Sequence, residues 1–397
     1  MPNTFKITDL ARIGGEARFL VYHDGRKVID SFFISRAPIR GFEKLMVGKN
    51  PIFAIEAAMR ICGICHAAHG IAAVEAIENS VGIAPPPNGI YLREIIGLLN
   101  RIQSHIVHMI FITRDLLREN MAEQMIRREI KLLVDVSNLL TRFGGAPTHP
   151  PYIVLGGVQS LPKERYIEDS NKKLKGMRDE FYEINNIFFD EQYWSEKASL
   201  LSQMKVQVKY LASHPFYGDR YNINVDEVTA IRYEKFRRKE EVPEDVKKTT
   251  SLIALYRGDI VEVGPRARLS LYGRFKDDSL LGIQRARLME IVLAIDRILE
   301  LLANISLTEP PKTPTIIFRR GVGIAVYEAP RGTLIHNVEI DSEGRIAKYR
   351  IIVPTMFNIP VMEKASVGVP IECADVVPRL YDPCIPCSTH LIRVNNG

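Results

Sequence analysis

Cysteine is scarce in this chain, and the few that occur are not scattered. Only five are present among 397 residues, four of them in two CxxC pairs, Cys62 with Cys65 and Cys384 with Cys387, while Cys373 stands alone. The N-terminus also lacks a basic start followed by an apolar core, the pattern of an export signal. Because paired CxxC motifs without an export signal are typical of metal or redox chemistry, a disulfide framework is disfavoured.

Long apolar runs, low-complexity tracts and internal repeats are missing as well. No stretch reaches the roughly eighteen apolar residues of a membrane span, so we expect a soluble, cytoplasmic protein with no membrane span. The composition, 46% apolar and 25% charged, is typical of a globular protein that buries a large core.

The formal net charge of +6 does not indicate a nucleic-acid partner. Part of the surplus lies in "RYEKFRRKEEVPEDVKK" (232–248), where charges of opposite sign alternate. This pattern favours a solvated protrusion, so we expect no nucleic acid to bind.

Strand-like patterns occur at both ends of the chain. Residues 5–36 read as strands around Asp24 and Gly25, and this Asp-Gly pair is a strong hairpin signal. Past residue 310 the period returns toward two, and "LIHNVEI" and "RIAKYRIIV" around "DSEG" predict a second hairpin. We therefore expect an N-terminal β segment over 1–49 and a C-terminal segment of strands and loops over 311–390.

Between these segments, residues 50–310 predict a helical core. Apolar residues recur at helical spacing over 92–117, 123–145 and 282–305. The sequence therefore predicts an α+β, mainly α fold in a single domain over 1–397, with a central bundle of long helices and small β-sheets from the N- and C-terminal segments.

The two CxxC pairs suggest a shared metal site. Four thiolates favour zinc, iron-sulfur or other soft transition-metal centres, and structural zinc is the simplest interpretation. Zinc ribbons, however, close their loop within about 15–20 residues, whereas more than three hundred residues separate these pairs. Each pair also carries flanking residues of the kind that orient metal ligands, so a redox or catalytic metal is an equal alternative. These residues are Arg60, His69, Asp382, Pro383 and His390.

At these residues the chain resembles a known family. "RICGICHAAH" (60–69) and "DPCIPCSTH" (382–390) are similar to the RxCGxCxxxH and DPCxxCxxH signatures of the large, catalytic subunit of nickel-iron hydrogenases. The resemblance runs from residue 8 to 390 and is strongest to the cytoplasmic, deazaflavin-coenzyme-reducing type of methanogens. Further stretches that carry it are "RGFEKLMVGK" (40–49), "LASHPFYGDR" (211–220), "VEVGPRAR" (261–268), "EAPRG" (328–332) and "IVPTMFNIP" (352–360).

The resemblance implies a nickel-iron centre and its ligands. All four paired cysteines would bind nickel, and Cys65 and Cys387 would also bridge to an iron that holds carbon monoxide and cyanide. Such a centre can polarise dihydrogen between a Lewis acid and a thiolate base, which implies reversible heterolytic cleavage of dihydrogen.

The resemblance also implies residues around that centre. Arg331 matches the family arginine above the site, Pro330 lines the pocket and Thr355 matches a hydroxyl donor to the iron ligands. His69 matches the histidine that bonds a bridging cysteine, and Asp382 is a pocket residue in the family. From the residues alone, Arg331 could be an ordinary salt-bridged arginine and Asp382 only a turn initiator.

A second metal ion is implied near the C-terminus. Glu43 and His390 match ligands of a magnesium or iron ion that ties the C-terminus into the core. Glu43 could otherwise be an exposed carboxylate at a helix start. The family is processed by proteolysis just after the motif histidine, so residues 391–397 resemble a cleavable tail and imply a maturation protease.

One departure from the family concerns proton transfer. Gly14 stands where most members carry a glutamate that exchanges protons with a bridging cysteine. Glu16 lies two residues on, where strand alternation could aim it the same way. Either Glu16 substitutes or protons take another route.

Several polar residues match no functional position or differ from the usual one. Ser104 stands where many relatives carry aspartate. His105 and His108, three apart on an apolar helix, are expected to be core histidines, and His66 to be incidental.

The electrons from dihydrogen would require partners. With only Cys373 left over, this chain cannot hold an iron-sulfur cluster, so a partner with clusters is needed. The resemblance implies the hydrogenase small subunit, docked near the first motif, and a flavin subunit that reduces the deazaflavin coenzyme. Three alternatives remain: a large subunit feeding heterodisulfide reductase or a pyridine nucleotide, a silent scaffold like that of respiratory complex I, and a zinc-stabilised structural subunit.

Overall fold

The computed structural model describes residues 4–237, 242–314 and 316–389, and its first element is a small sheet. Strands β1 (Thr4–Leu10), β2 (Ala17–His23) and β3 (Val28–Ser35) pair antiparallel in that order. The Asp24 carboxylate accepts hydrogen bonds from the backbone N–H groups of Arg26 and Lys27, which closes the β2–β3 turn. The first predicted hairpin is therefore confirmed.

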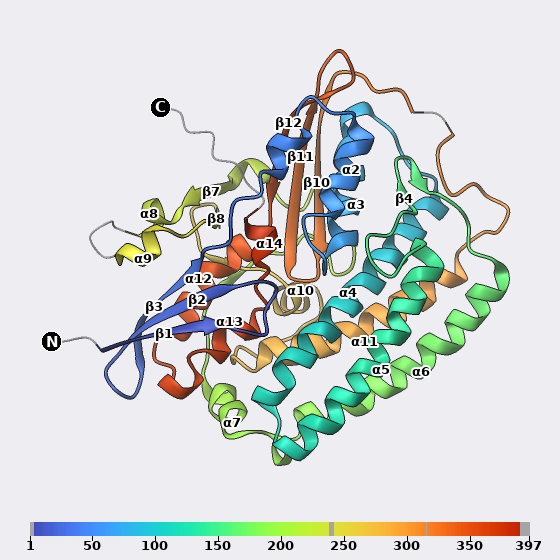
Figure 1. Ribbon diagram of the computed structural model, residues 1–397. Coiled ribbons are helices and arrows are strands. Elements are labelled where there is room, and N and C mark those ends of the chain that lie inside the picture. The colour runs from blue at the N-terminus through green and yellow to red at the C-terminus, as the bar shows by residue number, and fades with distance from the viewer. Residues whose placement is uncertain (1–3, 238–241, 315, 390–397) are drawn as a thin grey trace.

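A second antiparallel sheet comes from the C-terminal part of the chain. It contains β10 (Gly321–Ala329), β11 (Gly332–Ile340) and β12 (Ile346–Ile352), and β11 and β12 form the second predicted hairpin. Helix α3 (His66–Val81) lies against β10 (Figure 1). A Cβ atom at Gly323 would overlap a backbone carbonyl of α3, so glycine permits this close approach.

Four long helices fill the other side of the molecule. Helices α4 (Pro87–Leu116), α5 (Glu119–Gly144), α6 (Glu164–Phe189) and α11 (Gly282–Ala303) pack in pairs, α4 on α5, α4 on α11 and α6 on α11 (Figure 1). Helix α5 ends where Gly145 adopts a left-handed conformation, with φ of 86°. The three long helices predicted from periodicity correspond to α4, α5 and α11.

Helix α4 is long and apolar enough to cross a membrane by length and composition. However, 83% of its apolar window is buried inside the fold. Its apolar side chains therefore serve the core between α5 and α11.

Shorter elements connect these layers. Six short strands pair as β4 (Ile153–Val154) with β5 (Gly157–Val158), β6 (Lys209–Tyr210) with β9 (Val261–Glu262), and β7 (Val228–Arg232) with β8 (Leu252–Tyr256). The short helices before the second sheet are α1 (Phe42–Met46), α2 (Pro51–Met59), α7 (Glu196–Gln203), α8 (Tyr233–Phe236), α9 (Glu244–Lys247) and α10 (Pro265–Tyr272). The helices after it are α12 (Pro354–Ser366), α13 (Val376–Leu380) and α14 (Ile385–Ser388).

The C-terminal segment differs in one respect from its prediction as strands and loops. Helix α12 is thirteen residues long and is buried at every position except Lys364. Helices nevertheless dominate and the sheets are small, so the predicted α+β, mainly α class is confirmed.

Three distant parts of the chain converge where the sheets and α3 meet. Gly14, just after β1, forms a parallel bridge with Cys384. The Gly14 N–H donates to the Pro383 carbonyl at 3.2 Å, and the Ile385 N–H donates to the Gly14 carbonyl at 2.7 Å. The second CxxC pair is thereby fixed between the N-terminal strands and the start of α3.

Candidate metal centre

The two CxxC pairs form one buried cluster. The ligand atoms of all four cysteines lie within 4.8 Å of one another. The Sγ atoms of Cys62 and Cys384 are 3.4 Å apart, and those of Cys65 and Cys387 are 3.3 Å apart. Each contact joins one pair to the other, so the fold brings together ligands that lie more than three hundred residues apart in the sequence.

Backbone geometry around the first pair aims its sulfur atoms inward. Cys65 is the residue that precedes the first turn of α3, and the N–H groups of Ile64 and Cys65 donate to the Cys62 sulfur at 3.3 and 3.2 Å. Backbone N–H groups and the positive end of a helix stabilise thiolates. The backbone at the start of α3 therefore stabilises the thiolate form of Cys62, the form that binds metal ions.

Two side chains brace the second pair. The Cys384 N–H donates to the Thr355 hydroxyl of α12 at 3.0 Å. Arg40, before α1, donates to the carbonyls of Ile61 and Pro386, the residues preceding Cys62 and Cys387. Arg40 thus joins the two cysteine motifs, a role that the sequence did not reveal.

The pKa values of three of the cysteine thiols are shifted in different directions. Hydrogen bonds from the neighbouring cysteines and the charge of Arg331 hold the pKa of Cys62 well below its usual range. Interaction with Cys384 raises the pKa of Cys65, and burial raises that of Cys387. A bound soft cation replaces such protons, which couples metal binding to proton release.

On one side the cluster faces a buried ion pair. Arg331 donates from Nε to the Asp382 carbonyl at 2.6 Å and from Nη2 to the Asp382 carboxylate at 2.9 Å, and it also reaches the Ser104 hydroxyl at 3.3 Å. Burial acts to raise the pKa of Asp382, but the Arg331 charge holds it well below its usual range. Arg331 is therefore a buried cation in a salt bridge with Asp382, and its role toward a metal stays a prediction.

A further network holds the turn that carries Arg331. Arg268 of α10 makes two hydrogen bonds to the Glu290 carboxylate, at 2.5 and 2.7 Å, and one to Glu328 at 3.1 Å. It also donates to the carbonyls of Ala329 and Pro330 at 3.0 and 3.1 Å. We call Arg331, Asp382, Arg268, Glu290 and Glu328 the arginine flank.

On another side, a line of rings leads away from the cluster. The Cys387 sulfur lies 3.5 Å from His69 Nε2, and His69 Nδ1 lies 3.2 Å from His336 Nε2. His336 Nδ1 in turn lies 2.9 Å from the Tyr349 hydroxyl. We call His69, His336 and Tyr349 the histidine flank; the sequence indicated only its first member.

The residues predicted at the second ion are only partly covered by the structure. Glu43 is half-buried in α1 and accepts a hydrogen bond from the Ile351 N–H at 2.6 Å. His390 lies outside the described residues. The Arg40 N–H donates to the Thr389 carbonyl at 2.9 Å, which brings the last described residue close to the start of α1.

Gly14 and Glu16 occupy different surroundings. A Cβ atom at Gly14 would lie 3.7 Å from the Cys384 sulfur, so this backbone adjoins the cluster. Glu16 is exposed just before β2. The position that resembles the family glutamate therefore presents only backbone to the site.

The prediction of core histidines in α4 is confirmed. His105 Nε2 lies 2.7 Å from the Glu290 carboxylate, and His108 Nε2 lies 3.1 Å from the Gln284 side chain. Burial lowers the pKa of His105 to about 3 and that of His108 to about 4.

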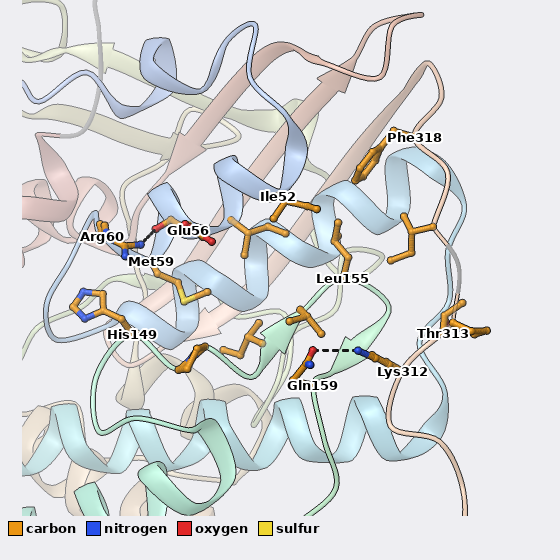
Figure 2. Close-up of a pocket in the computed structure, with 16 residues that line it drawn as sticks. Ile52, Glu56, Met59, Arg60, His149, Leu155, Gln159, Lys312, Thr313 and Phe318 are labelled. Carbon is orange, nitrogen blue, oxygen red and sulfur yellow. Dashed lines mark hydrogen bonds between the residues drawn. The ribbon is translucent and has the colours of Figure 1, made fainter.

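A pocket of about 490 Å³ opens beside the first cysteine pair. Figure 2 shows Met59, Arg60 and His149 at one end and Phe318 and Lys312 at the other. The His149 ring lies 5.1 Å from the ring of His66, which directly follows Cys65. The pocket therefore reaches within two side chains of the cluster.

The donor set fits a soft, catalytic metal centre. Four sulfur ligands suit nickel, iron or zinc. Arg331 donates to a single carboxylate and Asp382 Oδ2 is buried without a hydrogen-bond partner among the described residues, so polar capacity remains for groups carried by a metal. Structural zinc alone gives these buried polar groups no role.

Comparison with known proteins identifies the family. A model described as nickel-dependent hydrogenase matches residues 40–113 and 276–390. The alpha subunit of coenzyme F420 hydrogenase from Methanocaldococcus jannaschii is 35% identical over 98% of this chain and 94% of its own length. A second relative, from the F420-non-reducing hydrogenase vhu of the same organism, is 27% identical over 90% of this chain and 96% of its own length.

Solved structures share the fold. A Ni-Fe-Se hydrogenase chain from D. vulgaris Hildenborough superposes with a TM-score of 0.83 at 20% identity, covering 98% of this chain and 100% of that chain. Its helices and small sheets are thus arranged as they are here. The relatedness over almost the whole length, together with the buried four-cysteine cluster, leads to one conclusion: the chain belongs to the nickel-dependent hydrogenase family, oxidoreductases that act on dihydrogen, as a large subunit.

Proposed function

We propose that this chain is the catalytic subunit of a cytoplasmic, multi-subunit nickel-iron hydrogenase that cleaves dihydrogen heterolytically and reversibly. The observation that carries the proposal is the convergence of four buried sulfur atoms between Arg331 and His69. The electrons pass to a partner that holds iron-sulfur clusters, and from there to a deazaflavin coenzyme.

The four cysteines would hold the metals in this proposal. All four would bind nickel, and Cys65 and Cys387 would also hold an iron that carries carbon monoxide and cyanide. When bound, such a metal pair supplies the Lewis acidity that polarises dihydrogen. Arg331, Pro330 and Thr355 surround the ligands of the iron.

The protein's own groups handle the proton and the charge. The Cys387 sulfur would hold a proton beside the metals, and His69 orients that sulfur. Arg331 supplies positive charge close to an anionic cluster, and Asp382 fixes its guanidinium plane through two contacts. Because all these groups are buried, water does not weaken their interactions.

Electrons must leave through a partner. Among the described residues the one remaining cysteine, Cys373, is buried in a different segment and cannot hold a cluster alone. We place the iron-sulfur small subunit over the pocket beside the first motif (Figure 2). Ile52 is 54% exposed there, and its apolar surface lies near Arg60 and Lys312, a mixture typical of protein interfaces.

The final acceptor and two C-terminal features complete the proposal. Identity is higher to the F420 hydrogenase chain than to the F420-non-reducing one. This difference favours a deazaflavin coenzyme, reduced by a flavin subunit, over heterodisulfide reductase or a pyridine nucleotide.

Glu43 with His390 would bind magnesium or iron. A maturation protease would remove residues 391–397.

The test combines metal analysis with isotope exchange on the purified complex. We expect about one nickel per chain and deuterium exchange from D₂ into water, and loss of both in Cys384→Ser, because a hydroxyl is a poor ligand for these metals. Cys373→Ser is the matched control and should retain both. Zinc in place of nickel, or exchange that survives Cys384→Ser, would contradict the proposal.

A further inference from the structure

The histidine flank joins three buried residues to the cluster in a single line. His69 is 1% exposed, His336 is 0% exposed and Tyr349 is 4% exposed. Three contacts connect them in order: the Tyr349 hydroxyl with His336 Nδ1, His336 Nε2 with His69 Nδ1, and His69 Nε2 with the Cys387 sulfur. Each ring is therefore bonded through both of its nitrogen atoms.

Two layers of the fold hold this line rigid. His336 lies on β11, where it pairs with Ile351 of β12, so Tyr349 stands diagonally two residues away on the same face. The His336 and Tyr349 rings meet edge to face at 5.6 Å. His69 comes from the first turn of α3, so a sheet positions a helix residue beside the cluster.

Hydrogen-bond chemistry leaves two possible directions for the line. A neutral imidazole carries one N–H and one acceptor nitrogen. If the phenol donates to His336 Nδ1, His336 must donate from Nε2, and His69 must then donate from Nε2 to sulfur. If the line runs in the opposite direction, an acceptor nitrogen of His69 faces Cys387. A metal-bound thiolate only accepts, so it is compatible with the first direction alone.

The phenol is suited to start the line. Burial raises the pKa of Tyr349 well above its usual range, so the hydroxyl keeps its proton. Among the described residues, the negative charge of Glu43 raises the pKa of this phenol further.

We propose that His336 and Tyr349 are positioning residues that fix the tautomer of His69, so that its Nε2–H donates to the Cys387 sulfur. The inference rests on the proposed function, in which Cys387 bridges the metals and receives the proton. A donor on this sulfur withdraws electron density from it, and so lowers its basicity and the electron density on the iron.

The test uses Tyr349→Phe, which removes one hydroxyl and keeps the ring. In the purified complex, the stretching band of iron-bound carbon monoxide should move to lower wavenumber, because a sulfur without its donor returns electron density to the iron. Deuterium exchange should change by at most about 10-fold, the lower end of the range for a direct partner of a metal ligand, because Tyr349 acts through two histidines. Tyr327→Phe is the matched control, since Tyr327 is also a buried sheet tyrosine and its hydroxyl has no partner among the described residues.

A second pair of variants separates positioning from packing. His336→Gln keeps an N–H near the place of Nε2 and should retain most of the native band position, whereas His336→Leu should lose it. Nitrogen-15 NMR of histidine-labelled complex should report the Nε2–H tautomer of His69 in the native protein and Tyr327→Phe, and a mixture in Tyr349→Phe and His336→Leu.

The readouts distinguish two kinds of failure. An unchanged His69 tautomer in Tyr349→Phe and His336→Leu, with band positions matching Tyr327→Phe, overturns the positioning role. Zinc in the site with no carbon monoxide band overturns the proposed function, yet the tautomer measurement still decides the positioning role, because zinc-bound thiolate is also only an acceptor.

Discussion

The two flanks of the cysteine cluster are built from different interactions. On the arginine flank, Arg331 and Arg268 are buried cations held by carboxylates and by backbone carbonyls. On the histidine flank, two imidazoles and a phenol form one line of single hydrogen bonds. The arginine flank supplies positive charge that needs carboxylate partners. The histidine flank supplies a line of hydrogen bonds that ends at the Cys387 sulfur.

This difference predicts different sensitivities. Removing one partner of a buried ion pair leaves an uncompensated charge, which costs about 3–5 kcal/mol. Losing one neutral hydrogen bond costs about 1 kcal/mol. Substitutions on the arginine flank should therefore affect folding, whereas those on the histidine flank should affect the chemistry of the sulfur while the protein stays folded.

The largest effect is expected for Glu290→Gln. Burial acts to raise the pKa of Glu290, but Arg268 and Arg101 hold it well below its usual range, so the group is ionised and its charge is needed. We expect the free energy of unfolding to fall by about 3–5 kcal/mol. Denaturant titration of the purified protein measures this change, with nickel content as a second readout because Arg268 holds the turn of Arg331.

A half-buried ion pair at the surface provides the matched control. Glu180→Gln breaks a contact with Arg128 at 2.6 Å, but both side chains reach solvent, so the expected loss is about 0–1 kcal/mol. Equal losses for the two variants would show that burial does not distinguish the arginine flank.

An intermediate loss of stability is expected when the pH is lowered. Burial lowers the pKa of His108 to about 4, and Arg287 acts in the same direction. Below about pH 6.5 the unfolded chain protonates this histidine and the folded protein does not, so stability is complete above pH 6.5 and falls as the pH drops toward 4. The loss should reach about 1.4 kcal/mol per pH unit for this one group.

The variant His108→Gln checks this dependence. Unfolding free energies measured between pH 4 and 7 should fall less steeply on acidification than in the native protein. The difference between the two slopes should correspond to one bound proton, about 1.4 kcal/mol per pH unit. His105, with a pKa lowered to about 3, should supply the slope that remains from this helix. Identical slopes in variant and native protein would mean that His108 is protonated in the fold.

Much of the fold follows from local patterns, and α12 shows where these patterns fail. The hairpin at Asp24 and the helices α4, α5 and α11 have periodic apolar residues and clear turn or end signals. Helix α12 begins at Pro354, contains Pro360, and is buried on nearly every side, so no periodicity distinguishes its faces. A helix that is buried on nearly every side therefore gives no pattern that separates it from strand and loop.

The candidate site divides in the same way. The four cysteines and their motif neighbours could be predicted because each CxxC pair is local in sequence. His336 could not, because its contact with His69 joins residues 267 positions apart and exists only once α3 packs on β11. Glu290 and Arg40 were missed for the same reason, since their partners are brought to them by tertiary structure.

The smallest effect is expected at Gly14, where the chain presents only backbone to the cluster. A Cβ atom in Gly14→Ala would lie 3.3 Å from the Pro383 carbonyl and 3.4 Å from Cys384 Cα, so we expect a loss of about 1 kcal/mol and full metal content. Gly15→Ala is the comparison: with φ of 96° and contacts of 3.0 Å to Ile385 and Pro386, it should lose more. Denaturant titration and nickel analysis measure both. If Gly14→Ala were the more damaging variant, or if it lost nickel, this side could not hold a side chain without backbone movement. A glutamate at this position would then have no room, and protons would have to leave the cluster by another side.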